Sequence, residues 1–197
     1  MNWFCLDFSS VQSRLLHTII KSAVTGLSVK GLAPFLDRVT VTVNSSHISA
    51  GNCGITVSTT EYGECVECGP SSSDSNEKEI LKSVLVNVED TEIDGGSYGV
   101  RCSGRAIDCS VTNSRLLMNL VAVSCENVRS CTVQHCIMNS SSPHQLAINA
   151  VNTQTLVVDS NVIANKTGRV LRASMCNSVQ ARFFVIFNQV RVGLYPT

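Results

Sequence analysis

The segment Cys109-Ser-Val-Thr-Asn-Ser-Arg-Leu116 decides how this chain folds, because its pattern returns along the sequence. An apolar residue, any residue and a second apolar residue are followed by four mostly polar positions and a third apolar residue. Six segments follow this pattern, and they begin at Val41, Val86, Cys109, Cys131, Leu156 and Phe183. Their second apolar residues are Val43, Val88, Val111, Val133, Val158 and Val185. From Val88 onward these are 22 to 27 residues apart, a spacing typical of repeat architectures.

Each repeat contains short strands with alternating apolar residues and no helical pattern between them. The third apolar residues run Ile48, Ile93, Leu116, Met138, Ile163 and Val190, and a further pulse comes seven residues after several of them, at Ile55, Val100, Val123 and Val170. Two residues later lie Val57, Cys102 and Cys125. Alternation of period two places one face of each strand inside. The sequence therefore predicts an all-β, right-handed, single-stranded parallel β-helix, a solenoid of about six coils. A leucine-rich repeat would need a leucine and asparagine signature that is absent, and a β-sandwich would not keep such a ladder.

The repeat, from Arg38 to about Val192, resembles the pectate-lyase-like β-helix superfamily, to which carbohydrate-active enzymes and phage tailspike proteins belong. The resemblance is one of pattern, without a family-specific motif.

Two segments stand outside the coils. Residues 1–36 are expected to form an N-terminal cap, because Gln12 to Thr25 has apolar residues spaced for one face of an amphipathic helix. A solenoid needs such a cap over its open end; the alternatives are a helix that docks a partner, and an incomplete coil within Leu27 to Leu36. Residues 37–197 form the β-helix. Within it, 62–79 is a polar, turn-rich insertion, either a recognition loop or a tolerated insertion.

Ten cysteines are many for 197 residues. Cys65 and Cys68 form a lone Cys-x-x-Cys and are weak metal candidates, because a structural zinc site needs four ligands. The alternatives are loop cysteines, either free or disulfide-linked, and a redox pair. Cys109 stacks on Cys131, and Cys102 on Cys125. Stacked side chains point the same way, so we expect all four to be buried thiols, and buried thiols favour folding in a reducing cytoplasm.

The acidic residues crowd one strand and its turn. Glu89, Glu92 and Asp94 are weak catalytic candidates, because a glycosidase on this fold needs two carboxylates beside a groove and neither Glu89 nor Glu92 stacks on a second carboxylate. Glu92 instead falls between His47 and Arg115, which predicts a solvated charge ladder. We expect no cofactor and no resident metal, and the chain reads as a non-enzyme rather than an enzyme.

Composition limits the partners. The formal net charge is zero with 15 basic and 15 acidic residues, and no basic run marks a nucleic-acid surface. No stretch approaches the ~20 apolar residues that cross a bilayer, so membrane insertion is not expected. The first residues lack a cationic segment before an apolar core, so no secretory signal is expected.

The outward positions change from polar to apolar toward the C-terminus, which predicts an interface made of Ile137, Val157, Val162, Phe184 and Ile186. The alternative is that the N-terminal helix or Leu194 to Thr197 covers this patch. The resemblance to tailspikes implies a homotrimer. The expected function is a non-enzymatic structural or attachment protein of a virion (a spike, fibre or capsid decoration) at a virion or extracellular surface, with a surface glycan as partner. A polysaccharide lyase or glycoside hydrolase, and a cell-surface adhesin, are the alternatives.

Overall fold

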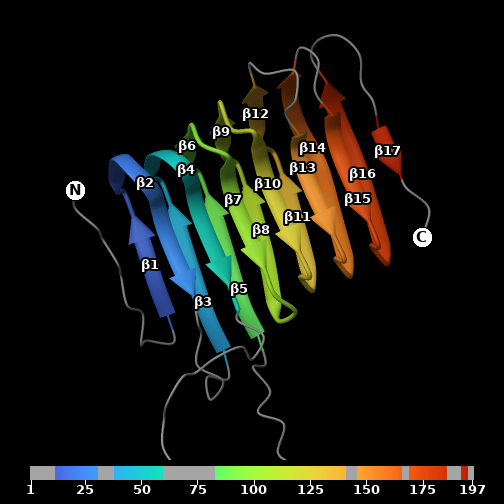
Figure 1. The fold of residues 1–197 in the computed structure, drawn as a ribbon, viewed down its shortest axis with the longest axis horizontal. Coiled ribbons are helices and arrows are strands. Elements are labelled where there is room, and N and C mark those ends of the chain that lie inside the picture. The colour runs from blue at the N-terminus through green and yellow to red at the C-terminus, as the bar shows by residue number, and fades with distance from the viewer. Residues whose placement is uncertain are drawn as a thin grey trace, which may run out of the picture.

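The computed structural model is a parallel β-solenoid, and Figure 1 shows its coils following one another in chain order from blue β1 and β2 to red β16 and β17. The structure describes residues 12–30, 38–59, 83–140, 146–165, 169–185 and 192–194. These residues contain strands and no helix. The all-β solenoid predicted from the repeat is confirmed. The insertion 62–79, with Cys65 and Cys68, lies outside the described residues.

The strands form three parallel stacks, because each one pairs with the strand of the next coil. The first stack contains β1 (Gln12–Leu16), β3 (Arg38–Asn44), β5 (Ser83–Glu89), β8 (Ile107–Thr112), β11 (Ser130–Gln134) and the first parts of β14 (Thr155–Asn165) and β16 (Ser178–Val185). The second contains the later parts of β2 (Ile19–Lys30) and β4 (His47–Ser58), then β7 (Tyr98–Ser103), β10 (Val121–Glu126), β13 (Leu146–Val151), β15 (Arg169–Ser174) and β17 (Val192–Leu194). The third is short: it consists of β6 (Glu92–Asp94), β9 (Arg115–Leu117) and β12 (Ile137–Ser140), with the starts of β2 and β4 and the ends of β14 and β16.

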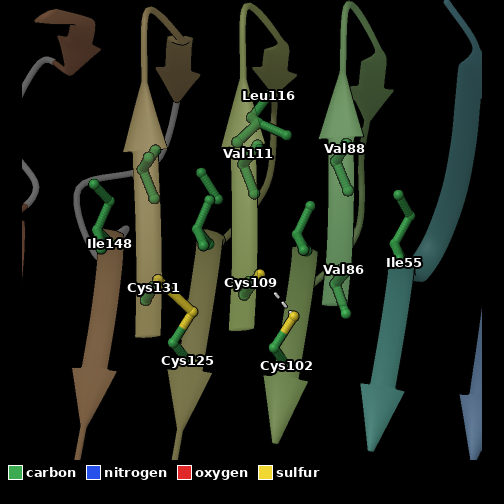
Figure 2. Packing of buried hydrophobic residues seen from close by; sticks show 14 of the residues in the cluster. Ile55, Val86, Val88, Cys102, Cys109, Val111, Leu116, Cys125, Cys131 and Ile148 are labelled. Carbon is green, nitrogen blue, oxygen red and sulfur yellow. Dashed lines mark hydrogen bonds between the residues drawn. A yellow bond between two sulfur atoms is a disulfide. The ribbon is translucent and has the colours of Figure 1, made fainter. Parts of the chain in front are cut away.

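The core is built from columns of like residues, as the repeat predicts. In the first stack Val43, Val88, Val111, Val133 and Val158 face one another in register and are buried. In the third stack the column is Ile48, Ile93, Leu116, Met138 and Ile163. Ile55, Val100 and Val123 form the corresponding column of the second stack, with Val57, Cys102 and Cys125 beside it. Figure 2 shows members of these columns meeting inside the coil.

The register predicted for the last coil is wrong. Val158 pairs with Ala181, and Val185 pairs with Ile163 instead. A register shift between Val158 and Asn161 leaves two residues at the corner of β14 opposite one in β16. The prediction is already four residues out before the corner, where Ala181 takes the place expected for Val185. The shorter corner adds one residue to this error, since Ile163 pairs with Val185 and not with the expected Val190. The predicted Val170 is also displaced, since Leu171 pairs with Ile148 of the second stack.

The predicted N-terminal helix is wrong as well, because Gln12 to Thr25 lies in β1 and β2. Leu15 pairs with Val43 and Ile20 with Ile48, so the segment is another copy of the repeat. The apolar pairs Leu15/Leu16, Ile19/Ile20 and Ala23/Val24 recur every four residues, which is a helical spacing. The step from Leu15 to Ile20 nevertheless corresponds to the step from Val43 to Ile48. The pairing of this segment with β3 and β4 outweighs its weak local preference for helix. Leu27 also pairs with Ile55, so the alternative of a coil is confirmed there, whereas 1–11 and 31–37 lie outside the described residues.

The corner between the first and third stacks positions the candidate site. In successive coils, non-glycine residues adopt positive φ angles there: His17, Ser45, Asp90, Asn113, His135 and Ser160, with φ between 48° and 54°. The residue that follows each of these positions points inward, and its polar side chain can form a hydrogen bond with the neighbouring coil. The Ser114 hydroxyl accepts a hydrogen bond from the Thr91 backbone N–H at 3.2 Å and donates one to the Thr112 carbonyl at 2.8 Å. Such bonds satisfy buried backbone groups that the turn leaves unpaired.

Candidate functional site

An open cleft of about 510 Å³, lined mainly by polar residues, lies along this corner over the N-terminal coils. Two outward columns supply most of its walls, one from the positive-φ turns and one from the first residues of the third stack. The lining residues are His17, Ile19, Ser45, Ser46, His47, Asp90, Thr91, Glu92, Asn113 and Arg115. We call this feature the corner cleft. It contains side chains of both charges, together with hydroxyl and amide groups, and Ile19 is its apolar member.

A charge ladder runs along one wall of the corner cleft. His47, Glu92 and Arg115 face one another in register on β4, β6 and β9. Glu92 Oε1 lies 3.3 Å from His47 Nδ1, and Glu92 Oε2 lies 3.4 Å from Arg115 Nη1. The predicted ladder is confirmed. Because all three side chains are partly exposed, these two contacts contribute little to stability, but they hold the three groups in a defined arrangement.

The predicted carboxylates separate in space. Glu92 lines the corner cleft, as does its neighbour Asp90, whereas Glu89 and Asp94 are not among the lining residues. Glu89 accepts a hydrogen bond from Asn44 Nδ2 at 3.2 Å on the first stack. The cleft therefore contains two carboxylates beside imidazole and guanidinium groups, and this set can bind hydroxyl and charged groups of a ligand.

Several residues that line the corner cleft were not predicted from the sequence. Asn113, Ser45 and His17 occupy the positive-φ turn that follows each strand of the first stack. A polar residue directly after each strand was the available signal, because Asn tolerates this conformation better than most residues. His17 was also hidden by the helical interpretation of its segment.

The predicted interface residues are only partly brought together. Ile137 and Val162 pair directly on β12 and β14, and Phe184 of β16 pairs with Val162. Ile137 is 42% exposed, and Val162 is half-buried. Val157 is also half-buried but lies on the first stack, where it pairs with Gln180 rather than with Phe184 as the predicted register implied. The side chain of Phe184 and the whole of Ile186 lie outside the described residues.

One outward column thus changes character along the solenoid. It runs through Ile19, His47, Glu92, Arg115, Ile137, Val162 and Phe184. The middle of the column is charged and borders the corner cleft, whereas the positions that follow it toward the C-terminus are apolar.

The cysteine columns differ from their predicted chemistry. Cys109 and Cys131 stack in register without a bond between them, as expected, but Cys131 forms a disulfide with Cys125. The expectation of thiols is therefore wrong for Cys125 and Cys131, because each faces across the coil interior toward a residue of another stack. Cys102 and Cys109 are buried thiols in this structure, as expected.

Among the described ranges, no three His, Cys, Asp or Glu side chains are grouped to hold a metal ion. The same ranges contain no helix of the length and apolarity needed to span a membrane.

Comparison with known proteins gives no relative. No protein-family model matches the chain, and neither a curated protein nor a solved structure is significantly similar to it.

Proposed function

We propose that this protein is a non-enzymatic attachment or structural component of a virion, such as a spike, fibre or capsid decoration protein. In this proposal the N-terminal coils bind a surface glycan in the corner cleft, and the C-terminal coils hold copies together at a virion or extracellular surface. The observation that carries it is the column that changes from His47, Glu92 and Arg115 to Ile137 and Val162.

The solenoid suits such a role because its scaffold is rigid. The three stacks continue through successive coils, so backbone groups on one coil pair with the next. A cleft on this frame is largely preformed, so binding loses little conformational entropy. Attachment to a surface also requires that the recognition site keep its geometry at a distance from the anchoring part.

The ligand follows from the groups in the corner cleft. Arg115 and the histidines His17 and His47 can donate hydrogen bonds, and Asp90 and Glu92 can accept them. A carbohydrate presents hydroxyl groups that both donate and accept. A mixed set of this kind therefore fits a glycan better than a purely anionic or apolar ligand.

Glycan binding is tested by screening the protein against a glycan array. Arg115→Ala and His47→Ala should each weaken binding, because they remove donors from the cleft. Arg101→Ala is the matched control, since Arg101 lies on the second stack beside Tyr98 and Glu126. If Arg115→Ala and wild type bind the same glycans equally, the corner cleft is not the binding site.

Assembly follows from the apolar end of the column, and the resemblance to tailspikes implies a trimer. Phe184→Asp combined with Ile186→Asp should give a folded monomer by light scattering, because association would bury unpaired carboxylates at an apolar interface, which is unfavourable. Ser110→Asp, an outward residue of β8, is the control and should leave assembly unchanged. A wild-type protein that is monomeric at high concentration and away from any larger particle would contradict this part of the proposal.

The second candidate function is a polysaccharide lyase or glycoside hydrolase. The specific observation in its favour is that Asp90 and Glu92 line one cleft together with His47. Two carboxylates beside a groove are what glycoside hydrolysis requires. Release of reducing ends from a polysaccharide panel, lost in Glu92→Gln, would establish this activity and overturn the non-enzymatic proposal.

A further inference from the structure

Four cysteines meet in the core of two adjacent coils. Cys102 and Cys125 lie on β7 and β10 of the second stack, and Cys109 and Cys131 lie on β8 and β11 of the first. The backbone register pairs Cys102 with Cys125 and Cys109 with Cys131. All four are buried. Figure 2 shows that the side chains of each coil point toward each other across the interior.

One coil already contains a cross-core bond. Cys125 and Cys131 form a disulfide, with their Cα atoms 6.4 Å apart, within the range that disulfides adopt. In the preceding coil the Sγ atoms of Cys102 and Cys109 are 2.8 Å apart. The two pairs come from strands that are stacked in register, so the second pair repeats the arrangement of the first.

We propose that Cys102 and Cys109 form a second disulfide, parallel to Cys125–Cys131, so that two consecutive coils are each cross-linked between the first and second stacks. The oxidant is a disulfide of the glutathione or oxidoreductase class. The thiolate of one cysteine attacks this disulfide and releases one thiolate, and the second cysteine then displaces the other. Two protein thiols lose two electrons and two protons, and the external disulfide becomes two thiols.

The direction of the side chains selects this pairing over the alternatives. Stacked residues such as Cys102 and Cys125 project in parallel from neighbouring strands, whereas Cys102 and Cys109 project toward each other. The pairs across the core are therefore expected, and not the pairs along the columns.

Burial places the reaction early in folding. The hydrogen bond with Cys109, together with burial, raises the pKa of the Cys102 thiol well above its ordinary value. Because the thiolate is the reacting species, the closed coil reacts slowly. The bond forms while the coils are still assembling, when both thiols are accessible to the oxidant.

Peptide mapping tests the pairing directly. The full chain is refolded in a glutathione redox buffer, free thiols are alkylated, and the protein is digested with trypsin without reduction. Arg105 separates Cys102 from Cys109, and Arg129 separates Cys125 from Cys131, so each cross-core bond joins two peptides. We expect peptide 102–105 linked to 106–115. Recovery of both as alkylated peptides, or of 102–105 linked to 116–129, would overturn the proposal.

Stability measurements distinguish a bond from simple packing. Cys102→Val combined with Cys109→Val keeps the core apolar while it removes the second disulfide. We expect wild type to unfold at a higher urea midpoint than this variant, and a reductant should abolish the difference. A difference that persists in reductant would show that the pair acts through packing, which contradicts the proposed bond.

Discussion

The register of the valine column can be tested at Val111. This residue is fully buried on β8, between Val88 of the preceding coil and Val133 of the next. Ser110, its neighbour along the strand, points outward and is half-buried. A shift of the strand by one residue would exchange the two, so substitutions at these positions report the register.

The size of the effect follows from what Val111 contacts. Val111→Ala removes two methylene equivalents at about 0.8 kcal/mol each, and the unfilled cavity adds about 1 kcal/mol. The expected loss is about 3 kcal/mol. Val111→Asp places an unpaired carboxylate in the core at a cost of several kcal/mol. Since a domain has only about 5–15 kcal/mol of stability, we expect Val111→Asp not to fold.

Urea unfolding followed by circular dichroism measures these differences. The matched substitutions Ser110→Ala and Ser110→Asp should change the free energy of unfolding by no more than about 0.5 kcal/mol, because Ser110 faces outward and its side chain is not part of the core. A soluble Val111→Asp protein that unfolds cooperatively would refute the register of the column. Equal losses for Val111→Ala and Ser110→Ala would do the same.

Two further predictions concern the buried corner of the later coils. Asn161 accepts a hydrogen bond from the Cys136 N–H at 2.9 Å and donates one to the Val133 carbonyl at 2.8 Å. Asn161→Leu leaves both backbone groups unpaired and should lower the unfolding free energy by at least about 2 kcal/mol. An unchanged urea midpoint for this variant would contradict these hydrogen bonds. Burial raises the pKa of the Cys136 thiol from its ordinary value of 9.0 to about 11, so its contribution to stability is complete below pH 9 and is lost as pH rises through 11. Wild type should therefore lose about 3 kcal/mol more than Cys136→Val over this alkaline range, and parallel losses in the two proteins would show that Cys136 does not carry the effect.

The sequence predicted the solenoid because apolar spacing is a local property that each coil repeats. Val43 to Val158 could be aligned on this spacing alone, as could Glu92 between His47 and Arg115. The prediction was wrong in the last coil, where Ala181 and not Val185 pairs with Val158. It was also wrong at Gln12 to Thr25, where apolar pairs recur every four residues as they do on one face of a helix.

The contents of the corner cleft and the disulfide required tertiary structure. Residues such as His17 and Asn113 come together only because turns of several coils stack with the same positive φ. Cys125 and Cys131 are bonded across the interior because their strands belong to different stacks, whose facing depends on how each coil closes. By itself, the repeat determined for the coils from Val43 to Val158 which residues point inward and which residue of the next coil each one faces. Which stack lies opposite another depends on the bends at the corners, and these are set by packing of the whole coil rather than by the spacing of apolar residues.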